Sequence, residues 1–284
     1  MDTQSIFIPF TKMQGAGNDF VVIDNRSLQF SKEELIKWTP QLCDRKFGIG
    51  SDGLLVLFPS DMDNADFQMF YRNPDGSDAG MCGNGGRCLS LFAHQLGFDR
   101  NHNFSVHKNL YQAQVIDQQN VRLTFPAQTS IDELTIDGQT IFKLHTGTEH
   151  IVTVVEDEKL EQSDQLVAEG RKLRYHQKFQ PKGTNVNFIS GVNERKLRLQ
   201  TYERGVEDLT LACGTGALAS ALVWHHLQDD KQEDIQPLSV ITEGGRLNIY
   251  FSYNSSDKSY SDLQLEGPAQ FVFEGQYPLS SLQA

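Results

Sequence analysis

The 284-residue sequence is short of basic side chains, because its 25 Lys and Arg residues face 37 Asp and Glu residues. A net charge of −12 disfavours nucleic acid and anionic membranes as partners, since both are bound through an excess of cations. Long apolar runs are also missing, and the run at 54–58 is too short to span a bilayer. The first residues lack the basic flank, apolar core and cleavage site of a signal peptide. Four cysteines are too few for a disulfide framework, so we expect a cytoplasmic, reduced protein.

Short strand-like runs with a few helical segments make up both halves of the chain. Helices are expected at 25–39, with Ser31 as a possible N-cap, at 84–95, closed by Gly97, and at 161–171 and 216–227. Strands are expected at 5–10, 20–23, 54–58, 67–72, 103–107, 113–116, 121–125, 140–144, 151–155, 184–189, 197–203, 238–242, 247–251 and 263–266. Because strands and helices do not alternate regularly, the pattern predicts an α+β fold rather than a doubly wound sheet.

The best candidate for a domain boundary is Pro126 with the polar stretch that follows it. This places one domain at 1–127, with 268–284 expected to return to it, and a second domain at 128–267.

Two short segments, one in each half of the chain, have similar sequences. Met81-Cys82-Gly83-Asn84-Gly85 and Ala212-Cys213-Gly214-Thr215-Gly216 both contain Cys-Gly-polar-Gly and then run into a predicted helix. A match this short can arise by chance, but its placement suggests two homologous halves, each with a cysteine at a helix start.

A cysteine at a helix N-terminus is suited to proton transfer. The unpaired N–H groups and the positive end of the helix dipole lower a thiol pKa from about 8.5 to roughly 3.5–7.5. Flanking glycines let a carboxylate approach the same N–H groups. Two such thiols across one bound acid could remove a proton from a carbon and return one to its other face. This chemistry inverts a stereocentre and requires no cofactor.

Other signals in the sequence have simpler interpretations. Cys43 and Cys88 are interpreted as buried small hydrophobes. The segment Gly48-Ile-Gly-Ser-Asp-Gly53 matches a dinucleotide loop by letter, but a strand-like run follows it instead of a helix. The histidines lack partners at metal-ligand spacing, so neither a metal nor a cofactor is expected. The acidic run 229–234 is interpreted as a solvated loop.

Over almost its whole length the sequence resembles the diaminopimelate epimerases, which are cofactor-independent racemases. The resemblance is strongest at Gly15-Ala-Gly-Asn-Asp-Phe20, at 73–88 and at 203–216. It implies two pseudo-symmetric domains, each a strand-rich, barrel-like sheet around a central helix, with the active site in the cleft between them. It also implies a homodimer.

The resemblance further implies a set of site residues. Cys82 and Cys213 would be the acid/base pair; in the LL-to-meso direction Cys213 accepts the proton and Cys82 donates one. His150, beside the cysteines, and Glu203 would also be catalytic. Glu203 and Arg204 would lie near the substrate, where Arg204 suits a distal carboxylate. The remaining implied contacts are Asn18, Asn73 and Asn185 and the backbone N–H groups of Gly83, Asn84, Gly214 and Thr215.

Four positions depart from the pattern of the resembled family. Gly53 stands where many members have Gln, and Glu149 stands where Pro is usual. Thr148 replaces a common Asn, and Leu209 occupies a position expected to be acidic. These departures leave the proton-transfer residues in place and bear on recognition of the distal end of the substrate.

The leading hypothesis is an isomerase that interconverts LL- and meso-2,6-diaminopimelate in lysine and cell-wall precursor synthesis. An alternative keeps the fold and the two-thiol chemistry but acts on another amino acid, as in proline-racemase relatives. A third hypothesis is a thiol redox sensor or metal-binding protein that uses Cys82, Cys88 and Cys213, although no Cys-x-x-Cys pair is present. A binding module without catalysis is disfavoured because activated thiols are prone to oxidation.

Overall fold

The computed structural model describes residues 7–228 and 237–282, and the chain divides into two compact units. One unit contains residues 1–122 and 268–284, and the other contains residues 123–267. The strand β7 (Asn120–Phe125) runs across this division. The acidic run predicted to be a loop at 229–234 lies outside the described residues. No described helix is long and apolar enough to cross a membrane.

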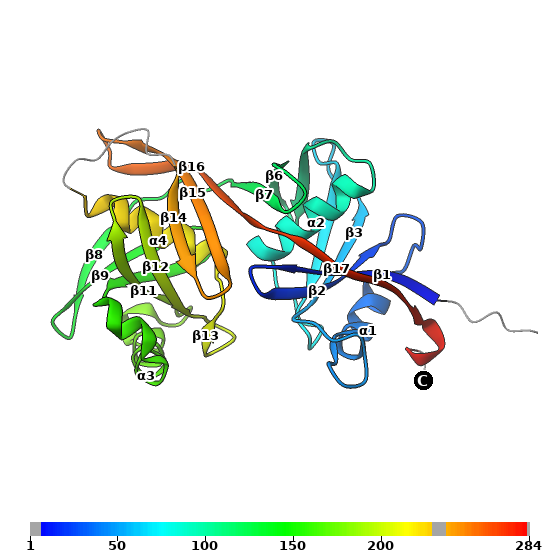
Figure 1. The fold of residues 1–284 in the computed structure, drawn as a ribbon, viewed down its shortest axis with the longest axis horizontal. Helices are drawn as coiled ribbons and strands as arrows, with labels where there is room; N and C mark the ends of the chain where they lie inside the picture. Colours follow the sequence, from blue (N-terminus) through cyan, green and yellow to red (C-terminus); the bar gives the residue numbers. More distant parts are fainter. Residues whose placement is uncertain (1–6, 229–236, 283–284) are drawn as a thin grey trace, which may run out of the picture. The chain divides into compact units, whose positions relative to one another are not determined.

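The first unit is a mixed sheet with two α-helices (Figure 1). Its strands pair in the order β17-β1-β2-β3-β4-β5-β6, with parallel pairs at β2·β3 and β4·β5 and antiparallel pairs elsewhere. The elements are β1 (Phe7–Gly15), β2 (Asn18–Asp24), α1 (Lys32–Cys43), β3 (Leu54–Pro59), β4 (Phe67–Arg72), α2 (Gly83–Gln95), β5 (Asn101–Val106), β6 (Asn109–Val115), β17 (Gln270–Pro278) and the 3₁₀ turn η3 (Leu279–Ser281).

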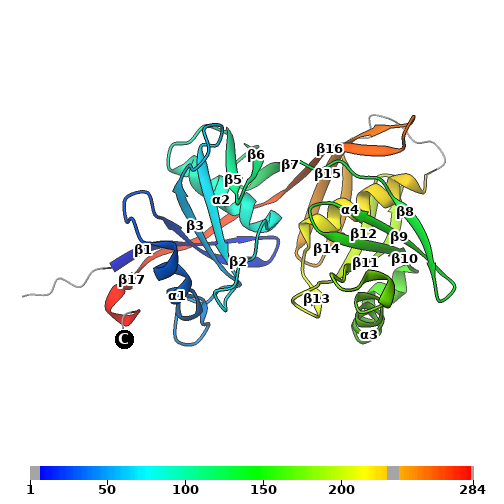
Figure 2. The ribbon, with the colours of Figure 1, turned by 180° about the vertical axis from the view of Figure 1, so that it is seen from behind.

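The second unit has the same kinds of element, seen from behind in Figure 2. Its strands pair in the order β8-β9-β10-β11-β12-β14-β15-β16, with parallel pairs at β10·β11 and β12·β14 and antiparallel pairs elsewhere. The elements are β8 (Asp132–Ile136), β9 (Gln139–His145), β10 (Glu149–Val154), η1 (Asp157–Glu161), α3 (Ser163–Arg174), η2 (Gln177–Phe179), β11 (Asn185–Asn193), β12 (Lys196–Tyr202), β13 (Leu209–Thr210), α4 (Gly214–His226), β14 (Leu238–Thr242), β15 (Gly245–Asn254) and β16 (Ser259–Pro268).

The two units repeat one sequence of pairing senses. Reading along each sheet gives antiparallel, antiparallel, parallel, antiparallel, parallel and antiparallel pairs in turn. The first helix of each unit, α1 or α3, connects the strands of the first parallel pair, and α2 and α4 connect those of the second. The predicted α+β class with two pseudo-symmetric, strand-rich parts is therefore confirmed.

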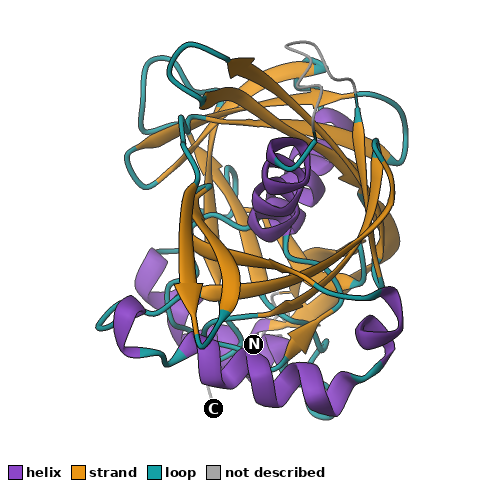
Figure 3. Ribbon diagram, turned by 90° about the vertical axis from the view of Figure 1, so that its left-hand side faces the viewer, coloured by secondary structure: helices purple, strands orange, loops and turns teal. Residues whose placement is uncertain are grey.

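The helices α2 and α4 are enclosed by strands, as the view along a helix in Figure 3 shows. Eleven of the thirteen residues of α2 and ten of the thirteen residues of α4 are buried. The apolar sequence of α4, which includes Leu218, Leu222 and Val223, suits this position because the helix has no broad polar face. Such helices meet polar surroundings mainly at their ends.

The helix expected at 25–39 begins later and ends later than the sequence indicated. Asn25 exchanges two hydrogen bonds of 2.9 Å with the backbone of Phe30, which holds 25–30 as a loop. The helix starts after Ser31, which forms a capping box with Glu34, and continues through Pro40 to Cys43. The predicted closure at Gly97 is correct: this residue has φ +99° and ends α2 in a Schellman motif, in which Phe98 N binds the Ala93 carbonyl.

Three strands were not predicted from the sequence, and one of them, β13, has only two residues. β17 pairs with β1 along its length, but most of its side chains are exposed on both faces, so its sequence lacks a period-two pattern. β8 lies within and after the polar stretch that was assigned to the domain boundary, and it is also mostly exposed.

The contact between α3 and β12 leaves no room for a side chain at Gly170. A Cβ there would lie 2.6 Å from Tyr202 Cβ, and Tyr202 is only 1% exposed. Gly-to-Ala substitution normally stabilises a helix by about 1 kcal/mol, whereas overpacking costs about 1–3 kcal/mol. We expect Gly170→Ala to lower the free energy of unfolding in urea. The added methyl group would overlap Tyr202 Cβ, which rotation of the tyrosine side chain cannot move away.

The exposed Ala168 on the same helix provides the control. Ala168→Gly should lose about 1 kcal/mol from helix propensity alone. A Gly170→Ala protein more stable than the parent would show that the helix can shift away from β12.

Candidate active site

Cys82 is the N-cap residue of α2. Its backbone is extended (φ −114°, ψ 122°), and its Sγ accepts a hydrogen bond from Gly85 N at 3.4 Å. Gly83 and Asn84 open the helix, so their N–H groups belong to the set without partners inside the helix. The sulfur therefore lies where the helix dipole favours a thiolate.

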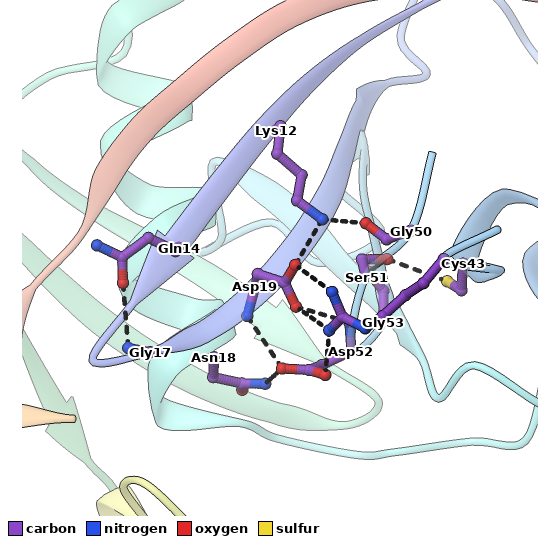
Figure 4. A network of polar contacts seen from close by, with 11 residues as sticks. Lys12, Gln14, Gly17, Asn18, Asp19, Cys43, Gly50, Ser51, Asp52 and Gly53 are labelled. Carbon is purple, nitrogen blue, oxygen red and sulfur yellow. Dashed lines mark hydrogen bonds and ion pairs between the residues drawn. The ribbon is translucent and has the colours of Figure 1, made fainter. Parts of the chain in front are cut away.

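Asn18, the first residue of β2, lies beside this sulfur. Its Oδ1 is 3.8 Å from Cys82 Sγ, and its Nδ2 donates to Asp52 Oδ2 at 2.9 Å. A carboxylate can only accept hydrogen bonds, so the contact with Asp52, drawn in Figure 4, fixes which end of the Asn18 amide is the NH₂ group. The oxygen of Asn18 consequently faces the sulfur.

Charged residues hold this part of β2 in place. Arg45 Nη2 contacts Asp19 and Asp52, each at 2.7 Å, and the buried Lys12 contacts Asp19 at 2.6 Å and the carbonyl of Gly50 (Figure 4). Burial opposes ionisation of Asp19, but the hydrogen bonds from Arg45 and Lys12 outweigh it and hold its pKa well below the usual range. Asp19 is therefore ionised at neutral pH.

Arg87 is a fully buried cation one turn into α2. Its Nε donates to the Pro268 carbonyl at 3.1 Å and its Nη2 to Asn84 Oδ1 at 2.7 Å. Its Nη1 has no hydrogen-bond partner among the described atoms. Burial lowers the pKa of Arg87 to about 10, although the nearby thiols of Cys88 and Cys82 act in the opposite direction. Arg87 thus supplies positive charge near Cys82.

The other two cysteines of the chain are buried thiols. Burial raises the pKa of Cys88 to about 12, and burial also raises the pKa of Cys43. Neither forms a thiolate readily at neutral pH, which agrees with their interpretation as packing residues.

Cys213 occupies the equivalent position at the N-cap of α4, with φ −107° and ψ 112°. Its Sγ lies 3.7 Å from Thr215 Oγ1, and Gly214 and Thr215 form the first positions of the helix. A Cβ on Gly216 would lie 2.4 Å from Asn187 Oδ1, so only glycine fits there. The helix start is packed directly against β11.

His150 is fully buried behind Thr215. Its Nε2 lies 2.8 Å from Thr148 Oγ1 and 2.9 Å from Thr215 Oγ1, and its Nδ1 lies 3.1 Å from Asn187 Nδ2. Burial lowers the pKa of His150 to about 3, and repulsion from His145 and Arg204 adds to the effect. The ring is therefore neutral at physiological pH and cannot act as an imidazolium acid.

Asn185 lies opposite His150 in the parallel register of β10 and β11. Its Nδ2 donates to the Glu149 carbonyl at 3.1 Å and to Thr148 Oγ1 at 3.2 Å, while its Oδ1 accepts from Arg204 N at 2.8 Å. Asn185 thus ties the segment after β12 to the start of β10.

Glu203 and Arg204 follow β12 directly. Burial raises the pKa of Glu203, against a 2.9 Å hydrogen bond from Thr210 Oγ1 that lowers it. Arg204 Nη1 donates to the Lys182 carbonyl at 3.0 Å. Asn73 lies in the turn after β4 and binds Ser77, so its described contacts stay within that turn.

Known proteins resemble this chain in sequence and in fold. The family model described as diaminopimelate epimerase matches residues 10–120 and 142–272. The curated diaminopimelate epimerase of Aquifex aeolicus is 39% identical over 283 residues, covering 94% of this chain and 96% of the relative. That of Flavobacterium psychrophilum is 37% identical over 264 residues, covering 93% and 97%. The chain belongs to the diaminopimelate epimerase family. The resemblance found in the sequence is confirmed.

Solved structures share the fold of this family at low sequence identity. A PhzF-family phenazine biosynthesis protein of Bacillus anthracis aligns with a TM-score of 0.71 and 14% identity, covering 95% of this chain and 99% of that one. A hydroxyproline epimerase of Agrobacterium vitis with bound trans-4-hydroxy-L-proline aligns with a TM-score of 0.69 and 14% identity, covering 98% and 94%. These likenesses extend to the fold alone.

The departures from the pattern of diaminopimelate epimerases have local structural counterparts. A Cβ on Gly53 would lie 2.5 Å from the Tyr71 ring, so that ring fills the space of a larger side chain. Leu209 packs against the apolar core of the second unit. Thr148 Oγ1 forms a hydrogen bond with His150, and the carbonyl of Glu149 accepts a hydrogen bond from Asn185.

Three residues of this diaminopimelate epimerase site were missed by sequence reasoning. Asn187 lies two positions after Asn185, and strand periodicity places both on one face of β11. Arg87 was visible as one charge in a helix of small and apolar residues. Asp52 had no such signal, because its role depends on its contact with Asn18 across the sheet.

Within 7–228 and 237–282, no group of three or more His, Cys, Asp or Glu residues could hold a metal ion. The polar groups of the site described above bind each other instead.

The buried charge of Arg87 generates a test of Cys82. Because a nearby cation favours a thiolate, Arg87→Met should move the inflection of the Cys82 alkylation rate upward by about one pH unit. Iodoacetamide labelling followed by peptide mass spectrometry across pH measures this shift. Arg87→Met also removes the donors to the Pro268 carbonyl and to Asn84 Oδ1, so the free energy of unfolding should fall by about 1–3 kcal/mol.

Two further variants separate charge from other effects. Arg87→Lys keeps the charge and should keep the inflection, while Arg26→Met removes a surface cation paired with Asp24 and should leave it unchanged. An inflection unaltered in Arg87→Met would show that Arg87 does not act on Cys82.

Proposed function

We propose that this chain is a cofactor-independent isomerase that interconverts LL- and meso-2,6-diaminopimelate. The observation that carries the proposal is the presence of Cys82 and Cys213 at equivalent N-cap positions of two enclosed helices. The family membership supplies the substrate class, since the compared relatives bear the name of this activity.

The proposed reaction is a proton exchange at one α-carbon. In the LL-to-meso direction the Cys213 thiolate accepts the α-proton, and the Cys82 thiol donates a proton to the opposite face. The reverse direction exchanges the roles. The C–H bond that breaks is replaced by a C–H bond of opposite configuration, so no oxidant or other reactant is needed.

Helix starts supply the stabilisation that this carbanion chemistry requires. The N–H groups of Gly83, Asn84, Gly214 and Thr215 would bind the reacting carboxylate and spread the developing negative charge. We assign the remaining substrate contacts to Asn18, Asn73, Asn185, Glu203 and Arg204, with Arg204 on the distal carboxylate. His150 stays neutral in this scheme and supports Cys213 by hydrogen bonding.

A second candidate function is epimerisation of another amino acid. The Tyr71 ring in the space expected for a polar side chain at position 53 favours it, because one contact to the distal end would be lost.

Exchange in deuterated water tests both candidates. The protein is incubated with a panel of L-amino acids, and incorporation of deuterium at the α-carbon is followed by NMR. We expect diaminopimelate to exchange far faster than the other amino acids, and faster exchange of any other would refute the proposal.

Cysteine variants test the two-thiol mechanism in the same assay. Cys82→Ala and Cys213→Ala should abolish epimerisation, since each removes one of two required proton carriers. Cys88→Ala, which removes a buried thiol, should retain most of it. Epimerisation by Cys213→Ala at the parent rate would contradict the assignment.

We also propose that the protein is a cytoplasmic homodimer that functions in lysine biosynthesis. The exposed side chains of Phe271, Val272 and Phe273 support dimer formation, because adjacent apolar residues on a strand favour burial by a partner. Size-exclusion chromatography with light scattering should give twice the chain mass. A Val272→Glu variant should shift the protein toward the monomer, and a parent protein of single-chain mass would refute the dimer.

A further inference from the structure

Asn187 is a fully buried amide to which the proposed mechanism assigns no part. It lies on β11 and reaches toward the start of α4, where its Oδ1 closely approaches Gly216. Its contacts join β10, β11 and β12: Ile151 O, His150 Nδ1 and Thr201 Oγ1. A buried polar group with all of these contacts is held in one orientation.

The contacts of the amide fix which end is NH₂. The Ile151 carbonyl can only accept, and it lies 2.8 Å from Nδ2. The Thr201 hydroxyl lies 3.0 Å from Oδ1 and can donate to it. The second hydrogen of Nδ2 is therefore available for His150 Nδ1 at 3.1 Å.

This hydrogen bond selects one tautomer of His150. A ring nitrogen that accepts a hydrogen bond carries no proton, and a neutral ring carries its proton on the other nitrogen. The proton must then be on Nε2, which donates to Thr148 Oγ1 or Thr215 Oγ1. Burial disfavours the alternative of an imidazolium, and the electrostatic effects of His145 and Arg204 on this ring act in the same direction.

The tautomer in turn determines to which atom the hydroxyl of Thr215 donates its hydrogen bond. With Nε2 donating, neither threonine hydroxyl can donate to the ring. Thr148 Oγ1 also accepts from Asn185 Nδ2, and it lies 3.3 Å from Thr215 Oγ1, to which it can donate. Thr215 Oγ1 accepts these hydrogen bonds, so its own proton can be donated to Cys213 Sγ, which lies 3.7 Å away.

We propose that Asn187 is a positioning residue that fixes His150 as its Nε2–H tautomer, so that the Thr215 hydroxyl donates to Cys213 Sγ and stabilises its thiolate. Its significance for catalysis rests on the proposed function, in which Cys213 accepts the α-proton. The hydrogen-bond direction itself is a property of the second unit and holds with or without substrate.

The ring nitrogens of His150 report the tautomer directly. In a long-range ¹H–¹⁵N spectrum of the uniformly labelled protein at pH 7, we expect Nδ1 to show the shift of an unprotonated nitrogen and Nε2 that of a protonated one. The His150 signals are assigned by their absence from His150→Gln. A protonated Nδ1 in the parent protein would overturn the proposal, and this measurement needs no Asn187 variant to fold.

Two substitutions test the role of the amide. Asn187→Asp replaces the donor with a carboxylate, which only accepts, so Nδ1 should become protonated. Thr201→Val removes the other partner of the amide but keeps its NH₂ group, and it should retain the parent tautomer. An Nδ1 that stays unprotonated in folded Asn187→Asp would count against control by residue 187.

The last step is tested at Cys213 by alkylation. Thr215→Val removes the final hydroxyl and should move the pH inflection of Cys213 alkylation upward by about one unit, whereas Thr215→Ser should keep it. An equal inflection in Thr215→Val and the parent would overturn the direction given to this hydroxyl.

These results are independent of the exchange assay. Failure of diaminopimelate to exchange, combined with an Nε2–H tautomer, would refute the proposed function but not this inference. Exchange combined with an Nδ1–H tautomer would refute only the inference.

Discussion

A helix enclosed by strands can meet polar partners only where it begins and ends, and this constraint governs both units. Most residues of α2 and α4 are buried, so their sides carry small and apolar residues. The backbone N–H groups at their starts, which have no carbonyl one turn earlier in the helix to bind, are the main polar feature left for chemistry. Cys82 and Cys213 lie at those starts, which explains why the proposed proton carriers are found there rather than along the helices.

The two units share a fold but place different neighbours around their cysteines. Cys82 lies beside the oxygen of Asn18 and near the buried cation Arg87. Cys213 lies beside a hydroxyl that is backed by a neutral histidine. A repeated backbone can therefore carry two thiols with unequal electrostatic surroundings.

Much of the fold was predictable because local chemistry determines it. The capping box at Ser31 and the left-handed glycine at Gly97 act within a few residues, so both were found. β17 and the loop at 25–30 were missed, since one depends on pairing with a distant strand and the other on the side chain of Asn25. At the site, the repeated Cys-Gly motif located the cysteines. Asp52 acts through a contact with Asn18 that no spacing encodes, and the signal for Asn187 was its place two residues after Asn185.

The packing of Tyr71 constrains how this chain could change in evolution. Its ring occupies the volume that a side chain at position 53 would need, and it packs edge-on against Phe20. A Cβ at position 53 would also lie 2.8 Å from the Arg72 carbonyl, so a glutamine there would require both a smaller residue at 71 and a shift of the backbone at 72. The smaller residue would leave a cavity beside Phe20, and substitution at position 53 alone is therefore expected to be selected against.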